Sequence, residues 1–162
     1  MKIINAGVTA PKGFKCAGLR AGVKSGKTNK DMAMIVSEVP AKIAGTFTKN
    51  IVKAAPVLWG KKIVEEQEAV RAVVINTGIA NACTGAQGYE NVVTEAKEVA
   101  KLLDIKPEEV VVGSTGVIGQ QLPMDVIKEG IKKLVPELKA DRQSEEDASW
   151  AILTTDTKPK EA

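Results

Sequence analysis

The sequence predicts a single layered α/β domain, and three observations lead to this prediction. Hydrophobic residues make up 44% of the 162 residues and aromatic residues only 3%, so the core must be built from small aliphatic side chains, which suit closely packed layers of sheet and helix. Two strongly apolar runs, 69–75 and 110–112, have the character of buried strands, and helical patterns follow both. The sequence contains no internal repeat and no low-complexity linker, so we expect residues 1–162 to form one domain.

The first half of the sequence is predicted to consist of antiparallel strands. Residues 13–23 alternate small or apolar residues with basic ones, and residues 32–37 form a short apolar run. The stretch 24–31 between them is rich in turn-forming residues, so a β-hairpin is expected. After Pro40, residues 42–48 are predicted to add a third strand to this meander.

Helices are predicted to alternate with strands in the second half. A proline suited to a first helical turn opens a predicted helix over 56–66, and the β-branched run 69–75 is expected to be a central, buried strand. Apolar residues at helical spacing predict two further helices, over 89–104 and 123–138. Ser144 is expected to cap a short final helix.

The composition argues against several classes of protein. Lysines and arginines are interspersed with acidic residues at a net charge of +3, which does not indicate nucleic-acid binding. Because there is no histidine, a Ser-His-Asp or Cys-His arrangement and a histidine metal site cannot be built from these residues. No apolar run has the length of a signal peptide or a membrane span, so a soluble, cytoplasmic protein is expected.

The cysteines and tryptophans are interpreted as structural residues. Cys16 and Cys83 have no metal-binding spacing and are expected to be reduced, buried small hydrophobes, in keeping with a cytosolic setting. Trp59 and Trp150 are expected to be core residues and not cofactor contacts. The lysines and glutamates of residues 95–109 are interpreted as a solvated helix face.

Two polar, glycine-rich loops are predicted after the two buried strands, where layered α/β proteins commonly place ligands. The sharper of them is 113–119, in which Ser114 and Thr115 supply hydroxyl donors beside glycines. A hydroxyl and an adjacent backbone N–H can together stabilise an oxyanion. A structural tight turn and a phosphate-binding turn are the alternatives, although the glycine spacing matches no phosphate-binding motif.

The second polar loop, 76–88, and the threonines near the C-terminal end carry weaker signals. Residues 76–88 have enough Asn, Thr and Gly either to line a substrate pocket or to satisfy their own backbone, and the sequence favours neither. Thr154, Thr155 and Thr157 are equally compatible with a strand edge, a helix cap or a binding role.

Five segments together resemble, in order and spacing, the pattern of the ornithine acetyltransferases of the ArgJ family. Each is weak alone, but the series is specific and covers essentially the whole sequence. The segments are 7–14, 44–50, 76–85, 113–119 and 151–157.

The resemblance implies an αββα sandwich of the kind found in the ArgJ and DmpA proteins, completed by a separate β chain. It implies an acyltransferase of arginine biosynthesis that moves an acetyl group from N2-acetylornithine to glutamate, with acetyl-CoA as a further donor in some members. The family precursor cleaves itself autocatalytically, and the new N-terminal threonine of the β chain is the nucleophile, its own amine serving as base. A dimer of αβ units, a heterotetramer, is expected, with no metal, cofactor, nucleic acid or membrane as partner.

The resemblance also assigns site residues. Thr115 and Gly116 match the oxyanion hole, with the Thr115 hydroxyl and the Gly116 N–H as donors, and Thr155 matches the substrate-binding threonine, with Thr154 as its neighbour. The family's cleavage segment is absent from the residues up to Ala162, so the nucleophile is expected in the β chain, and this chain alone is expected to be inactive. The alternatives are an amide hydrolase of the same fold and a phosphate- or nucleotide-binding structural subunit.

Overall fold

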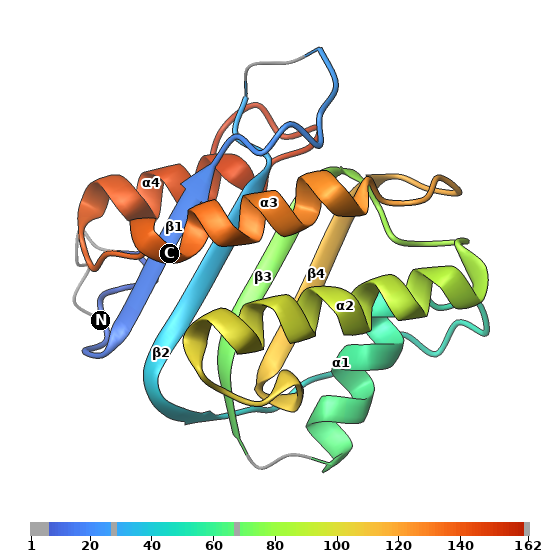
Figure 1. The fold of residues 1–162 in the computed structure, drawn as a ribbon, viewed down its shortest axis with the longest axis horizontal. Coiled ribbons are helices and arrows are strands. Elements are labelled where there is room, and N and C mark those ends of the chain that lie inside the picture. Colours follow the sequence, from blue (N-terminus) through green and yellow to red (C-terminus); the bar gives the residue numbers. More distant parts are fainter. Residues whose placement is uncertain (1–6, 27–28, 67–68, 161–162) are drawn as a thin grey trace.

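A computed structural model describes residues 7–26, 29–66 and 69–160 of the chain. Within these residues one four-stranded sheet with strand order β1-β2-β3-β4 forms the centre of the molecule (Figure 1). Its strands are β1 (Phe14–Leu19), β2 (Met32–Lys42), β3 (Ala69–Ile79) and β4 (Val110–Val117). The predicted α/β fold class is confirmed.

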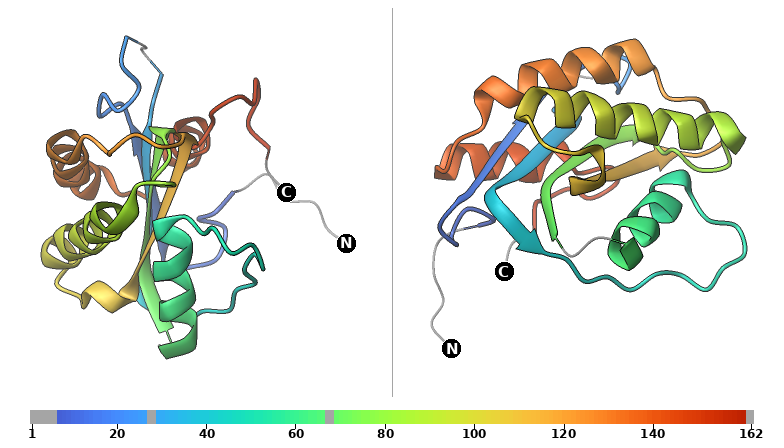
Figure 2. Two further views of the ribbon diagram at one scale, coloured as in Figure 1. Left: turned by 90° about the vertical axis from the view of Figure 1, so that its right-hand side faces the viewer. Right: turned by 60° about the horizontal axis from the view of Figure 1, so that its bottom comes forward.

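Helices cover the two faces of the sheet unequally. Their bounds are α1 (Ala55–Glu66), α2 (Gly85–Leu103), α3 (Met124–Leu134) and α4 (Arg142–Ala151), with short 3-10 turns η1 (Pro107–Glu109) and η2 (Val135–Glu137). Figure 2 shows α2 and α3 on one face and α4 on the other. On its face α4 contacts mainly β1 and β2, while α1 packs beside β4 and α2. The β3 and β4 half of the α4 face is therefore without a helix in the described part of the chain.

The sheet is mixed: its described strands form two antiparallel pairs and one parallel pair. β1, β2 and β3 are antiparallel neighbours, whereas β3 and β4 run parallel, as a crossover through α2 requires. β3 and β4 stay in register to their last residues, with Thr77 opposite Thr115 and Gly78 opposite Gly116. Both strands therefore deliver their carboxyl ends to the same edge of the sheet.

The strand predicted over 42–48 is wrong. Instead, β2 continues from the predicted 32–37 run through Pro40 to Lys42, and its pairing with β3 shifts between Val36 and Ala41. Pro40 lies within this irregularity, where its missing N–H costs no ladder hydrogen bond. Residues 43–54 then lead to α1 without regular structure.

The predicted helices are confirmed, with corrected ends. α2 begins at Gly85, earlier than position 89, and α3 ends at Leu134, since Pro136 in the next turn has no N–H to continue the helical ladder. Ser144 is not the cap of the last helix. Asp141 is, because its side chain accepts the Ser144 N–H at 2.8 Å.

Two apolar cores stabilise the sheet. The larger one fills the space between the sheet and α1, α2 and α3, and includes Met32, Met34, Val74 and Ile131. A smaller one lies under α4 and is built from Cys16, Ala33, Ala148 and Ala151, with Ile35 packed against it. Its small residues let α4 approach closely: a Cβ on Gly18 would lie 2.1 Å from the Asp147 carbonyl oxygen.

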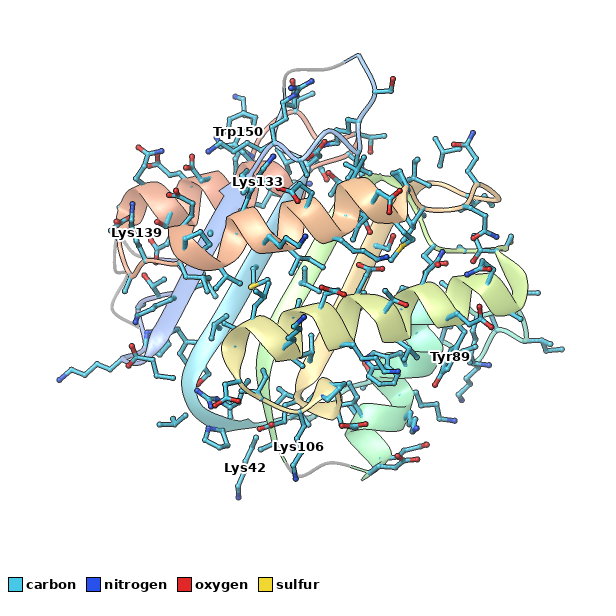
Figure 3. All side chains as sticks on the ribbon, in the orientation of Figure 1. Lys42, Tyr89, Lys106, Lys133, Lys139 and Trp150 are labelled. Carbon is cyan, nitrogen blue, oxygen red and sulfur yellow. The ribbon has the colours of Figure 1, made fainter. Side chains whose placement is uncertain are left out.

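The four candidate structural residues divide into two pairs. Trp59 is 4% exposed and its indole donates to the Val110 carbonyl oxygen at 2.9 Å, and Cys16 is fully buried, as expected for both. Trp150 is 47% exposed on the outer side of α4, so its assignment to the core is wrong (Figure 3). Cys83 is also exposed, because it lies in the loop before α2. Among the described helices, none has the length and hydropathy needed to cross a bilayer.

Candidate active site

The site is built on the parallel ends of β3 and β4. The sequence predicted loops over 76–88 and 113–119, but β3 continues to Ile79 and β4 to Val117, so both loops begin as strand. These predictions of loop structure are wrong for 76–79 and 113–117. Asn, Thr and Gly have low strand preference, but the parallel ladder between the two segments supplies the hydrogen bonds that each one needs.

Glycines allow the two strand ends to meet. Gly116 has φ +138°, and a Cβ there would lie 2.3 Å from both the carbonyl carbon and the carbonyl oxygen of Gly78. Gly78 itself has φ +108°. Both positions therefore need glycine, for conformation as well as for space. Gly116 is solvent-exposed, so no side chain covers the backbone at this point.

The two neighbouring hydroxyls of β4 are in different hydrogen-bonding states. Ser114 Oγ donates to the Ile79 carbonyl oxygen at 3.1 Å and accepts the Asn81 N–H at 2.9 Å. The Thr115 hydroxyl, on the opposite side of the strand, makes no hydrogen bond to any residue that the structure describes. Of the two candidate hydroxyl donors, Thr115 is thus the one whose proton has no hydrogen-bond acceptor among the described residues.

The polar side chains of residues 76–88 are hydrogen-bonded largely within this segment. Asn76, in β3, donates from Nδ2 to the Ile79 carbonyl oxygen at 2.8 Å, although its Oδ1 is buried without a hydrogen-bond partner among the described residues, and Asn81 Nδ2 donates to the Gly88 carbonyl oxygen at 2.8 Å. Thr84 Oγ1 donates to Asn81 Oδ1 at 2.6 Å. All three side chains are buried. Of the two interpretations of 76–88, the structure supports the self-satisfying loop for Asn81 and Thr84, and the Asn81 N–H also holds the Ser114 hydroxyl.

The segment that contains Thr155 reaches the same edge of the sheet. Thr155 is exposed in the bend after α4. Just before it, the Ala151 carbonyl oxygen accepts the Thr77 hydroxyl at 2.9 Å, and the Leu153 carbonyl oxygen accepts the Lys24 ammonium at 2.7 Å. Since Thr77 is opposite Thr115 in the ladder, the structure brings the segments of all three predicted site residues together. Thr154 is exposed as well, and the geometry does not separate it from Thr155.

A partly buried cluster around the Glu145 carboxylate holds residues 7–9 against α4. The Glu145 carboxylate accepts the Thr9 hydroxyl at 2.6 Å and the Thr9 N–H at 3.0 Å, and Arg142 lies 3.2 Å away. Burial raises the pKa of Glu145, but these hydrogen bonds and one from the Gly7 N–H outweigh it and lower the pKa to about 2. Glu145 also lines an open pocket of about 340 Å³ beside Ile35.

Glu95 was missed by the sequence interpretation, which assigned residues 95–109 to a solvated face. The side chain is completely buried on the inner face of α2, and neither carboxyl oxygen has a hydrogen-bond partner among the described residues. Burial raises its pKa to about 8. The signal was present in the sequence, because Glu95 follows Val92 by three positions and precedes Val99 by four, on the apolar stripe.

The described residues contain no group of three or more Cys, Asp or Glu side chains arranged to hold a metal ion. The site instead consists of an uncommitted hydroxyl beside an exposed glycine, at paired strand ends. A hydroxyl and an adjacent backbone N–H in this arrangement could both donate hydrogen bonds to an oxyanion, so the site has the chemistry of an oxyanion hole.

The comparisons with known proteins identify the family. The family model described as ArgJ family matches residues 15–162, and the chain belongs to this family. The chain is 48% identical over 160 residues to the arginine biosynthesis bifunctional protein ArgJ of Streptococcus mutans, a match that covers 99% of this chain and 38% of that protein. It is 45% identical over 155 residues to the chloroplastic protein of the same name from Citrullus lanatus, covering 96% of this chain and 34% of that protein. The chain therefore spans little more than a third of the length of these relatives.

Solved structures show the same fold. The arginine biosynthesis bifunctional protein ArgJ of Bacillus halodurans matches with a TM-score of 0.90 at 41% identity, covering 97% of this chain and 80% of that chain. The ornithine acetyltransferase of Mycobacterium tuberculosis, crystallised with ornithine, matches with a TM-score of 0.91 at 41% identity, covering 97% and 83%. The resemblance that the five sequence segments indicated is confirmed.

Proposed function

We propose that this chain forms the oxyanion-stabilising half of an acetyltransferase that moves an acetyl group from N2-acetylornithine to glutamate. The observation that carries the proposal is the contrast between Ser114, whose hydroxyl is fully used, and Thr115, whose hydroxyl is uncommitted beside exposed Gly116. The names of the relatives support arginine biosynthesis, and the ornithine in one solved relative supports the substrate class.

In the proposed reaction, an N-terminal threonine of a partner β chain attacks the acetyl carbonyl carbon of N2-acetylornithine. The amine of that threonine takes up the hydroxyl proton, and the carbonyl oxygen becomes an oxyanion that accepts hydrogen bonds from the Thr115 hydroxyl and the Gly116 N–H. Collapse of this intermediate breaks the C–N bond, ornithine leaves with the proton, and an acetyl ester remains on the threonine. The amine of glutamate then attacks the ester carbonyl carbon, the ester C–O bond breaks, and a proton from the glutamate amine returns to the threonine oxygen, which gives N-acetylglutamate and the free threonine.

Thr155 is proposed to bind the substrate beside these donors. It is exposed, and its segment is tied to Thr77 and Lys24 at the carboxyl end of β3, next to the oxyanion donors. Acetyl-CoA is a second proposed donor, supported by the word bifunctional in the names of the relatives. No further cofactor is needed for either transfer.

The partner chain is proposed to cover the surface beside the donors. Val117 is 57% exposed and Ile118 is 61% exposed, directly after Gly116. The adjoining half of the sheet, on the face that bears α4, has no helix in the described residues. A second layer on this face would complete the αββα sandwich, and it would bring a nucleophile to the donors. A dimer of such αβ units is the proposed assembly.

The structure of residues 113–119 does not fit the alternative of a phosphate-binding turn. A phosphate site of the common type needs a glycine-rich loop that opens a helix with free N–H groups. Residues 113–117 are instead strand, paired with β3, and α3 begins only at Met124.

The function is tested by expressing the chain together with its partner chain and supplying N-acetylornithine with and without glutamate. Formation of N-acetylglutamate together with ornithine supports acetyl transfer. If ornithine and free acetate form at the same rate whether or not glutamate is present, the protein is an amide hydrolase of the same fold, and the transfer function is refuted.

A further inference from the structure

Lys24 connects the two halves of the proposed site. It lies in the connection between β1 and β2, far in sequence from the site residues. Its ammonium donates to the Leu153 carbonyl oxygen at 2.7 Å and to the Lys30 carbonyl oxygen at 3.3 Å. Leu153 is two residues before Thr155. Hydrogen bonds from an ammonium to carbonyl oxygens are charge-assisted and stronger than neutral ones, so Lys24 is a firm attachment for this segment.

The backbone around Lys24 is held by hydrogen bonds to a buried carboxylate. Asp31 is fully buried and accepts the N–H groups of Ala21 at 2.6 Å, Gly22 at 3.1 Å and Lys24 at 2.9 Å. The Asp31 carbonyl oxygen in turn accepts the Thr77 N–H at 2.8 Å. The turn that presents Lys24 is therefore attached to β3 independently of its ammonium group.

The stem of Lys24 packs against the strand ends that carry the oxyanion donors. A Cβ on Gly78 would lie 2.7 Å from Lys24 Cγ, so the stem lies directly over the Gly78 backbone. The Gly78 backbone also packs against Gly116 of the neighbouring strand, where a Cβ would lie 2.3 Å from the Gly78 carbonyl group. One side chain thus packs on the oxyanion strands through its stem and holds the Thr155 segment through its ammonium group.

We propose that Lys24 is a positioning residue that sets the location of Thr155 relative to the Thr115 and Gly116 donors. Its ammonium bonds to backbone carbonyls and its stem packs on glycine backbone, so it acts through Thr155 and not on the reacting atoms. This role rests on the proposed acetyl-transfer function. Its expected consequence is a change in the binding of N-acetylornithine, with the chemical step largely preserved.

The test uses the two-chain protein with Lys24→Met, which keeps an apolar stem over Gly78 and removes the donor. Misplacing a binding group weakens substrate binding, so we expect the KM for N-acetylornithine to rise by ~10-fold or more while kcat changes by less than ~3-fold. Lys24→Arg retains a charged donor and is expected to recover part of the lost affinity. Lys30→Met is the matched control: Lys30 donates to the Gly18 carbonyl oxygen and pairs with Asp147, away from Thr155, and both constants should stay unchanged.

A double-mutant cycle with Thr155→Ala separates positioning from a general structural role. If Lys24 acts through Thr155, Lys24→Met adds little to the KM of the Thr155→Ala protein. Independent, additive effects would overturn the proposal, as would a lower kcat at unchanged KM. Should Lys24→Met fail to assemble with the partner chain, Lys24→Gln takes its place under the same criteria.

Amide hydrogen exchange gives a readout that does not depend on activity. Lys24→Met is expected to speed exchange in residues 152–158 and to leave residues 113–117 protected as in the wild type. Unchanged exchange in 152–158 would overturn the positioning role. If the wild-type protein transfers no acetyl group, the proposed function fails, and the exchange result still decides whether Lys24 holds this segment.

Discussion

At the scale of single residues, the proposed oxyanion site depends on which of two adjacent hydroxyls keeps its proton available. Ser114 has both its donor and an acceptor position in use, and it holds β4 to the turn that follows β3. Thr115 differs from Ser114 only by a methyl group and by the side of the strand on which it lies. The sequence alone could not separate them, because both are hydroxyl residues next to glycine. The family resemblance assigned Thr115, and the hydrogen bonds supply a physical reason.

Thr115→Ala is expected to lower kcat by ~100- to 1000-fold with little change in KM, because the lost donor acts on charge that develops in the transition state. Thr115→Ser retains the hydroxyl and is the control, expected to keep most of the activity. Steady-state kinetics of the assembled two-chain protein measure both. Equal activities for the Ala and wild-type proteins would remove Thr115 from the oxyanion hole.

Glu95 is the residue whose burial carries a pH dependence. Its pKa is raised from an ordinary value near 4.5 to about 8 in the folded chain, because burial disfavours the charged form. The folded state therefore binds more protons than the unfolded state between these values, so the stability falls as pH rises from about 4.5 through 8. Above that range the folded protein carries an uncompensated buried charge.

Glu95→Gln removes this charge and is expected to raise the free energy of unfolding at pH 9 by roughly 1–3 kcal/mol, with the gain shrinking toward zero near pH 5. Urea denaturation at a series of pH values measures the difference. Glu90→Gln, on the exposed side of the same helix, is the control and should show no such trend. A gain that does not vary with pH would contradict the linkage.

At the scale of elements, the carboxyl ends of β3 and β4 are strands that local sequence patterns could not predict. The buried strand cores 69–75 and 110–112 were predicted from β-branched residues, and the structure confirms both. Their continuations, up to Ile79 and Val117, consist of turn-forming residues and look like loops. Only the pairing of the two continuations with each other makes them strands, and a partner 38 positions away is invisible to local pattern.

Pairing also explains the failed strand at 42–48, whereas local backbone geometry explains the misplaced cap at Ser144. Residues 43–48 have strand-like composition, but they find no partner strand among the described residues. Asp141 and Ser144 are both residues that favour caps, and the backbone geometry of the chain entering α4 selects Asp141.

Gly116→Ala tests the contact between the two strand ends. The new Cβ would meet the Gly78 backbone at 2.3 Å from a φ of +138°, so the strands must separate. We expect a loss of more than ~2 kcal/mol in the free energy of unfolding and loss of acetyl transfer. Thermal or urea unfolding of the assembled protein measures the first.

Gly119→Ala is the matched control for Gly116→Ala. Gly119 also has a positive φ, +81°, but a Cβ there would meet nothing within 4 Å. It should therefore cost only ~1 kcal/mol, the strain of a left-handed alanine. Equal losses at the two positions would show that close packing of Gly116 on Gly78 is unimportant.

At the scale of the whole molecule, half of one sheet face carries no helix among the described residues, and we propose that a partner chain covers it together with the apolar residues beside the proposed oxyanion donors. Sequence reasoning could infer this only through the family resemblance, because composition and periodicity describe a chain's own core and not the surface that another chain covers. In the proposed reaction, the described residues supply the hydrogen-bond donors and a substrate-binding segment, and a β chain supplies the nucleophile. The proposed function depends on this division of roles between two chains.

That claim is tested most directly by locating the acetyl group during turnover. The two-chain protein is incubated with N-acetylornithine in the absence of glutamate, quenched, and both chains are analysed by intact-mass and peptide mass spectrometry. We expect one acetyl group on the first residue of the partner chain, none on this chain, and much slower acetylation in the Thr115→Ala protein. An acetyl group on a residue of this chain would contradict it.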